Sequence, residues 1–434
     1  MKSKLLIGLA FLGFISLTSC KKICQIFCAD CNDTTQCNPP PDKKSYLDSQ
    51  VVAYNPSPVL IHFLDSVGYK KKDSCNCTEK IELWAGNKSA EEIIGLVGNK
   101  CPTCNDGTGD LSAVDGIGFN FKLDFGRDSI IRTRVPASRG DTPILKSRPV
   151  IPNIKMKNGY PGQSTFLDIG IIDSGEGGDV DVNELRGNLW INPNSVECLM
   201  NSYTNGIDVT THNIVNPIDV LGHGNTVNCI ALGYPGDMPL TNVRVLNAKI
   251  LNTLDSGSLF KALCGSFFAL EHGAQILNMS WGFRGTKTQM PKMMIPFFKK
   301  SLEKGVLIVA AAGNNSSNID SLAFWPASFN SLYPNIITVG GLNENQNALW
   351  IGSNFGNSVD IYAKAENVHS VSLNGNLQVI GKGTSFAAPR VAHELAKIIT
   401  LHRDYDIYQV KDELLNNRTS NLPSTAYKKL NSSY

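Results

Sequence analysis

The sequence has 434 residues, of which 42% are hydrophobic and 18% charged, a composition that describes a globular protein and excludes a disordered chain. This length allows a catalytic-sized domain with a smaller domain beside it. The formal net charge is +2 and the Lys and Arg residues are dispersed, so no basic stripe predicts nucleic acid as a partner.

The first 20 residues have the features of a targeting segment. Lys2 and Lys4 precede an apolar run over residues 5–17, which is too short to span a bilayer comfortably. The run leads through small residues to Cys20, and this junction resembles the lipobox of bacterial lipoproteins. The resemblance implies cleavage before Cys20, lipidation of that cysteine, and an exported protein with a membrane anchor in the bacterial cell envelope. A plain secretory signal, cleaved nearby without lipidation, is the alternative.

Export bears on the 12 cysteines, because disulfides form in oxidising compartments. If lipid takes Cys20, an odd number remains and at least one thiol stays outside a disulfide. Cys28-x-x-Cys31 and Cys101-x-x-Cys104 have the spacing of a zinc site with four thiolates. Their separation in the chain and the export signal favour disulfides, and the sequence leaves the pairing open.

Three segments precede the main domain. Residues 21–44 are polar and rich in cysteine, so we expect a tether. Residues 45–125 show the short patterns of a small α+β domain, and residues 126–163 carry Pro and Arg with little periodicity, as a linker or N-terminal arm does. The elements expected in the small domain are strands at 50–54, 80–85 and 117–125 and a helix at 57–67.

From residue 164 to residue 434, short apolar runs alternate with helical patterns, which predicts an α/β fold with a mostly parallel sheet and crossover helices. Helices are expected at about 256–271, 292–303 and 408–415. The expected strands cover residues 166–173, 241–248, 275–280, 306–312, 336–340 and 359–362.

Ser385 stands where a glycine-containing stretch meets an apolar run with helical spacing. We therefore expect it at a helix N-terminus, where unpaired N–H groups and a partial positive charge suit a serine that attacks a carbonyl. Pro389 is expected in the first turn of this helix, where its missing N–H has no cost. An ordinary N-cap serine is the alternative.

Three other polar residues lie in contexts that suit a site. Asp173 closes an apolar strand, and ligands bind at the carboxyl ends of the strands in α/β sheets. His223 lies between two glycines, which leave its imidazole accessible. Asn314 follows a strand ending in Ala-Ala-Ala-Gly, where its amide can donate a hydrogen bond to an oxyanion. Taken singly, each is equally an ordinary turn or loop residue.

Taken together, the order Asp173, His223, Asn314 and Ser385 resembles that of the subtilisin-like serine proteases, or subtilases. The aspartate, histidine and serine motifs of that family match residues 171–175, 223–229 and 383–389, and the resemblance covers about residues 164–430. It implies a doubly wound subtilisin-like fold. The order of the residues also disfavours an esterase of the α/β-hydrolase type, whose triad runs serine, acid, histidine.

The resemblance also implies a function, that of a serine endopeptidase acting on protein or peptide substrates through an acyl-enzyme. Ser385 would be the nucleophile, His223 the base, Asp173 its orienting carboxylate and Asn314 an oxyanion donor. No cofactor is required for this chemistry, although many relatives bind structural calcium. Two segments are implied to form the walls of the substrate cleft: Ser280, Trp281 and Gly282, and Ala310, Ala311, Ala312 and Gly313. Candidate calcium ligands are Asp179, Asp181 and Glu184.

Several residues depart from the family pattern, and we expect them to affect how the helix of His223 packs on that of Ser385. They are Asn225, Thr226, Asn228, Cys229, Lys364, Ala365, Arg390 and His393. None of them removes a catalytic atom. The alternative function is that of a degenerate subtilase fold that serves as a surface binding protein. Residues 45–125 occupy the place of a subtilase propeptide, and a retained accessory domain is the alternative there.

Overall fold

The computed structural model describes residues 46–75, 79–100, 116–123, 131–134, 166–177, 188–191, 205–211, 217–234, 240–251, 257–287, 290–371, 377–422 and 427–431. The targeting segment, Cys20 and the tether of residues 21–44 lie outside these residues. The described chain belongs to one compact unit that begins at Tyr46.

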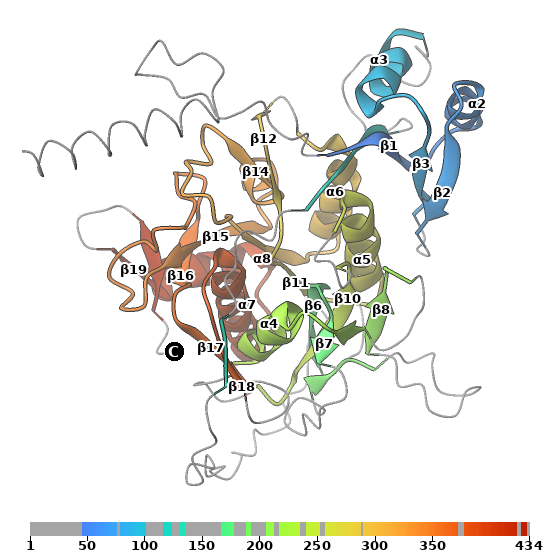
Figure 1. Ribbon diagram of the computed structural model, residues 1–434. Coiled ribbons are helices and arrows are strands. Elements are labelled where there is room, and N and C mark those ends of the chain that lie inside the picture. The colour runs from blue at the N-terminus through green and yellow to red at the C-terminus, as the bar shows by residue number, and fades with distance from the viewer. Residues whose placement is uncertain are drawn as a thin grey trace, which may run out of the picture. The chain divides into compact units, whose positions relative to one another are not determined.

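A nine-stranded sheet forms the centre of the main domain (Figure 1). Neighbouring strands pair in parallel, except that the first two strands in the order given below are antiparallel to each other. The predicted mostly parallel α/β fold is thereby confirmed. In spatial order the strands are β19 (Thr419–Asn421), β20 (Lys428–Leu430), β16 (Ile361–Lys364), β15 (Ile336–Leu342), β13 (Leu307–Ala311), β11 (Ile276–Met279), β6 (Leu167–Asp173), β10 (Val243–Lys249) and β8 (Gly206–Asp208).

Both faces of this sheet are covered by apolar side chains, which explains why its strands read as continuous hydrophobic runs. In β6, Ile169 and Ile171 belong to the core under α4 (His223–Ala231) and α7 (Thr384–Leu401). Ile172, one residue further, belongs to the core under α5 (Leu259–Glu271) and α6 (Ile295–Glu303). The side chains alternate between two helical layers, and polar residues are left at the strand ends.

The helices begin and end near the predicted residues. Ser258 is the N-cap of α5, and Gly273 follows that helix in the left-handed conformation at φ +88°. A short 3₁₀ segment, η4 (Lys292–Met294), leads into α6. Near the C-terminus, α8 (Ile407–Asp412) continues into the π-helical segment η6 (Glu413–Asn417).

The predicted place of Pro389 is wrong. Because α7 begins at Thr384, Pro389 is an interior residue of the helix and not part of its first turn. A proline there has no N–H to donate to the carbonyl four residues earlier, which is that of Ser385. The Oγ of Ser280 donates to that carbonyl instead, at 2.8 Å. The lost helical hydrogen bond is thus replaced by a bond that ties α7 to the end of β11.

Residues 46–121 form their own antiparallel sheet, in the order β2-β3-β1-β4. Its helix α2 begins with Pro58 behind the N-cap Ser57. The sheet and the expected helix were predicted in outline, whereas β2 and α3 were not. The elements are β1 (Tyr46–Tyr54), α2 (Pro58–Ser66), β2 (Lys70–Ser74), β3 (Ile81–Ala85), α3 (Ala90–Lys100) and β4 (Gly116–Phe121).

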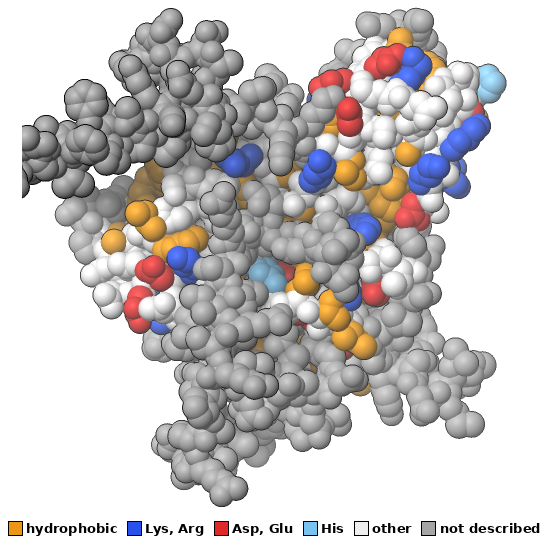
Figure 2. Space-filling model, in the orientation of Figure 1, with side chains coloured by type: hydrophobic (Ala, Val, Ile, Leu, Met, Phe, Trp, Pro, Cys, Tyr) orange, Lys and Arg blue, Asp and Glu red, His pale blue; other side chains and the backbone are white. Residues whose placement is uncertain are grey.

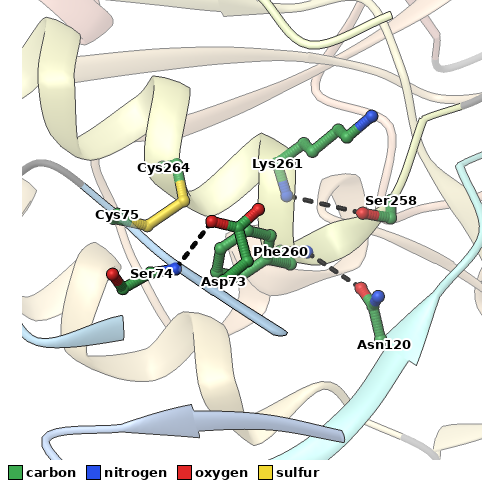
Figure 3. The surroundings of a disulfide bond; sticks show 8 residues. All are labelled: Asp73, Ser74, Cys75, Asn120, Ser258, Phe260, Lys261 and Cys264. Carbon is green, nitrogen blue, oxygen red and sulfur yellow. Dashed lines mark hydrogen bonds between the residues drawn. A yellow bond between two sulfur atoms is a disulfide. The ribbon is translucent and has the colours of Figure 1, made fainter. Parts of the chain in front are cut away.

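This small domain is joined to α5 by a disulfide and by a hydrogen bond (Figure 3). Cys75 pairs with Cys264 of α5 across 189 positions in the sequence. The Oδ1 of Asn120 accepts from the backbone N–H of Phe260 at 3.0 Å, so β4 satisfies one of the unpaired donors in the first turn of α5. Phe121 also stacks on Phe283 of the main domain, with ring centroids 4.3 Å apart. One hydrophobic core runs through both domains.

Three smaller sheets lie around the main one. β12 (Phe283–Gly285) pairs with β14 (Ala323–Trp325), and β7 (Glu176–Gly177) pairs with β9 (Ile218–Asp219). β5 (Ile131–Arg134), from the region predicted as a linker, pairs with β18 (Leu377–Gly381), which in turn pairs with β17 (Val368–Val371). The segment just before Ser385 is thus held in a sheet.

On the face shown in Figure 2, the described Lys and Arg side chains are interspersed with Asp and Glu. Among the helices that the structure describes, none is both long and apolar enough to cross a membrane.

Candidate active site

Asp173 and His223 meet at the carboxyl end of β6. The Oδ1 of Asp173 lies 2.7 Å from the Nδ1 of His223, and both side chains are buried. Because an ionised carboxylate can only accept hydrogen bonds, this contact places the proton on Nδ1 and leaves Nε2 as the basic nitrogen. The backbone N–H of Ser174 donates to the same oxygen at 2.7 Å. Two residues 50 positions apart thus form one buried unit.

Two glycines bring the helix of His223 this close to the strand of Asp173. Gly222, the residue before α4, has the left-handed φ of +85° that glycine adopts without strain. A side chain on Gly224 would collide with the carbonyl oxygen of Gly175. Instead, the N–H of Gly224 donates to the Oγ of Ser174 at 2.8 Å. The first turn of α4 therefore lies directly against the turn that follows Asp173.

Asp219 holds the start of α4 from the other side. Its Oδ1 accepts from the N–H groups of Leu221 and Gly222, and its Oδ2 accepts from that of Asn225, all within 2.9 Å. Burial raises the pKa of the Asp219 carboxyl above its ordinary value; the three backbone donors oppose this shift, and the neighbouring charge of Asp173 adds to it. Asp219 was not predicted from the sequence, because an aspartate before Val-Leu-Gly resembles any loop carboxylate.

Ser385 is the second residue of α7 and is buried. Its Oγ donates to the carbonyl oxygen of Ser280 at 3.1 Å, while the Oγ of Ser280 donates back to the carbonyl of Ser385. Asn278 in turn donates to the Oγ of Ser280 at 2.8 Å. The ring of the next residue, Phe386, lies beside that of His223, with centroids 5.3 Å apart. The predicted helix N-terminus thus carries Ser385 to the region of the Asp173–His223 pair.

Asn314 is fixed by the residue before Ser385. Its Oδ1 accepts from both the N–H and the Oγ1 of Thr384, at 2.8 and 2.7 Å. The N–H of Gly313 donates to the same Oγ1 at 3.1 Å. These bonds settle which end of the Asn314 amide is oxygen, and they couple the end of β13 to the start of α7. Thr384 lies within the predicted serine motif, but its role in holding Asn314 was not predicted.

The predicted cleft walls are the ends of two adjacent strands. Ser280, Trp281 and Gly282 follow β11, while Ala310 and the residues after it end β13. The side chains of Ala310, Ala311 and Ala312 are buried in the two cores of the sheet. At the carboxyl edge of the sheet, these residues therefore leave their backbone groups, and not their side chains, to contact a ligand.

The comparison with protein families matches residues 167–434 to the model of the Subtilase family. This match covers more than half of the chain and all four motif stretches. The chain belongs to the subtilase family.

Individual subtilases resemble it over more than half of its length. Subtilisin E of Bacillus subtilis (strain 168) is 29% identical over 259 residues, which are 59% of this chain and 61% of that protein. Subtilisin-like protease 2 of Plasmodium falciparum (isolate 3D7) is 27% identical over 251 residues, which are 56% of this chain but 18% of that protein. The chain thus spans less than two thirds of the length of these relatives.

A solved structure supports the fold assignment. The crystal structure of fervidolysin from Fervidobacterium pennivorans, described as a keratinolytic enzyme related to subtilisin, matches with a TM-score of 0.60. It is 17% identical, and the match covers 90% of this chain and 61% of that one. At this identity the likeness concerns the fold alone, and it confirms the predicted subtilisin-like architecture.

The departures from the family pattern do not separate the two helices of this subtilase. The Nδ2 of Asn228 donates to the Oδ1 of Asn247 in β10 and to the carbonyl of Gly224, both at 2.8 Å. The Nδ1 of His393 lies 3.1 Å from the carbonyl of Ala231, which joins α7 to α4. Both polar side chains are buried with hydrogen-bond partners, so α4 and α7 pack closely.

The candidate calcium ligands Asp179, Asp181 and Glu184 lie outside the described residues. Within the described part of the chain, no three His, Cys, Asp or Glu side chains are grouped to hold a metal ion. Glu176, which precedes that segment, is a buried carboxyl beside Asn205, and burial raises its pKa to about 7.

Proposed function

We propose that this subtilase hydrolyses peptide bonds as a serine endopeptidase, with Ser385, His223 and Asp173 as its catalytic triad. The observation that carries the proposal is the buried 2.7 Å hydrogen bond between His223 Nδ1 and Asp173, because it leaves Nε2 as a base. The position of Ser385 also supports the proposed triad. Ser385 lies in the first turn of α7, and the next residue, Phe386, has its ring beside that of His223.

In the proposed reaction, Ser385 Oγ attacks the substrate carbonyl while His223 Nε2 takes its proton and later gives it to the leaving amine. Asp173 holds the imidazole in the required tautomer and stabilises the imidazolium. The acyl-enzyme is then hydrolysed by water through the same groups. No cofactor takes part in these steps.

A fluorophosphonate probe tests this proposal directly, since it reacts with an activated serine. We expect stoichiometric labelling at Ser385. A folded protein that is not labelled and cleaves no peptide would instead favour the alternative of a degenerate subtilase with a binding role.

Asn314 and the backbone N–H of Ser385 are the proposed oxyanion donors. We expect Asn314→Ala to lower kcat by about 10²–10³-fold, the loss measured for the corresponding donor in subtilisin itself, with KM nearly unchanged. Asn330→Ala is the matched control, because it removes hydrogen bonds to Ser358 and Asp360 away from the site. An increase in KM alone would mean that Asn314 binds ground-state substrate.

The proposed substrate cleft lies between Ser280-Trp281-Gly282 and Ala310-Ala311-Ala312-Gly313. Backbone groups at the ends of two strands can pair with an extended peptide as an added strand. Protein and peptide chains are therefore the substrates that we propose.

We also propose export, lipidation at Cys20 and a propeptide-like N-terminal domain that stays tethered to the protease. The disulfide between Cys75 and Cys264 supports the tether. If the chain is cut between residues 124 and 165, the two products would remain covalently joined. The oxidising compartment that such a bond requires agrees with export.

Mass spectrometry of the purified protein, with and without reduction, tests these points together. We expect an acylated Cys20 at the mature N-terminus and a peptide pair linked through Cys75 and Cys264. After any cut in the linker, the two chains should separate only on reduction. A mature chain with an unmodified Cys20 would refute lipidation, and a domain released without reductant would refute the tether.

In Cys20→Ala the protein should lose the lipid and move to the soluble fraction.

A further inference from the structure

The two proposed walls of the substrate cleft are separated by an aromatic ring. Phe324, in the middle of β14, is 2% exposed. A Cβ added to Gly282 would lie 2.7 Å from the Cζ of this ring and closer still to its Cε1. A Cβ added to Gly313 would lie 2.8 Å from Cε2 and 2.9 Å from Cδ2. The ring therefore contacts the backbone of both glycines, one edge against each wall.

The backbone of Phe324 is held in place by its surroundings. β14 pairs with β12, with Phe324 opposite Arg284, and the N–H of Phe324 donates to the Oγ of Ser328 at 3.0 Å. The next residue, Trp325, packs on Phe329 with centroids 4.7 Å apart. A close-packed ring on a fixed backbone leaves its place only if its neighbours move as well.

We propose that Phe324 determines the specificity of this subtilase, by filling the space between the two walls that would receive the substrate side chain before the scissile bond. The inference rests on the proposed function. Because the ring occupies that space, the substrate residue before the scissile bond has to be small, which means glycine, alanine or serine. Large aromatic and branched side chains meet the phenyl ring.

The test uses peptide substrates that are identical except for the residue before the scissile bond, alanine in one and phenylalanine in the other. For the wild type we expect kcat/KM to favour alanine by about 10²-fold or more, since a filled pocket rejects added volume. Phe324→Ala should raise the ratio of kcat/KM for the phenylalanine substrate to that for the alanine substrate by about 10²-fold. Phe324→Leu should lie between the two.

Phe297→Leu is the matched control, because Phe297 is also a buried phenylalanine but packs on Phe267 and Phe298, away from β14. It should lower stability without changing the preference between the two substrates. A similar shift in preference in this variant would overturn the proposal, since it would show a general loosening of the domain. If Phe324→Ala does not fold, Phe324→Leu and the wild-type cleavage profile decide the question.

Fluorophosphonate labelling separates the possible failures. A wild type that is labelled at Ser385 but cleaves after phenylalanine, tyrosine or leucine as readily as after alanine overturns the role of Phe324 and leaves the proposed protease function standing. A wild type that is neither labelled nor active overturns the protease function, and the inference with it.

Discussion

Ser385→Ala should lower kcat by about 10⁶-fold, the loss measured when subtilisin itself loses its nucleophile. The remaining rate would be about 10³–10⁴ above that of the uncatalysed reaction, from binding and oxyanion contacts alone. Steady-state hydrolysis of a peptide substrate measures the first effect, and loss of fluorophosphonate labelling provides a second readout.

The fold should survive this change, because within the described part of the chain the hydrogen bond that it removes is the one from the Oγ of Ser385 to the carbonyl of Ser280. Such a bond contributes roughly 1 kcal/mol to the free energy of unfolding. Ser266→Ala, which removes a buried hydroxyl from α5, is the matched control and should keep full activity. If Ser385→Ala turns over substrate at nearly the wild-type rate, Ser385 is not the nucleophile.

Asp173→Asn should lower kcat by about 10⁴-fold with little change in KM. The amide keeps the shape of the carboxylate but removes the negative charge that stabilises the imidazolium. It also removes the preference for a proton on His223 Nδ1, since an amide can donate as well as accept. Labelling of Ser385 should slow by a similar factor, and this rate is measured independently of peptide turnover.

Asp168→Asn provides a comparison within the same strand. Asp168 is a buried carboxylate that pairs with Arg244 at 2.7 Å, away from His223. Removing its charge should lower thermal stability and leave kcat per folded molecule unchanged. If Asp168→Asn and Asp173→Asn lost the same activity, a negative charge in β6 would be needed for the fold, and Asp173 would have no separate role in the chemistry.

The sequence predicted the six central strands of the main sheet, β16, β15, β13, β11, β6 and β10, but not α3, β8 or β14, whose side chains are also buried. β6 and β13 are apolar on both faces, and their runs ended within one residue of the observed strands. Asp173 and Asn314 were located because polar residues follow such runs. β2 was missed because it begins with three exposed lysines, which carry no hydrophobic pattern.

What was not predicted depends on contacts between distant residues. Pro389 has no N–H to donate to the carbonyl of Ser385, and the Oγ of Ser280 donates to it instead. This hydrogen bond joins two residues that are 105 positions apart in the sequence. Asp219 accepts hydrogen bonds from backbone N–H groups, and the ring of Phe324 packs against the backbone of two glycines. Neither residue stands in a recognisable motif. No local pattern distinguishes such residues from ordinary loop or core residues.

The disulfide between Cys75 and Cys264 has a consequence for the order of folding. Loop closure favours short loops, and Cys77, Cys101 and Cys104 are all closer to Cys75 in the sequence than Cys264 is. We therefore expect the native pair to form after β4 and α5 have docked through contacts such as the hydrogen bond from Phe260 to Asn120. Once formed, a cross-link spanning 189 positions restricts the unfolded chain and contributes about 5 kcal/mol in the chain-entropy model. On this expectation, oxidation follows assembly of the two domains and then stabilises it.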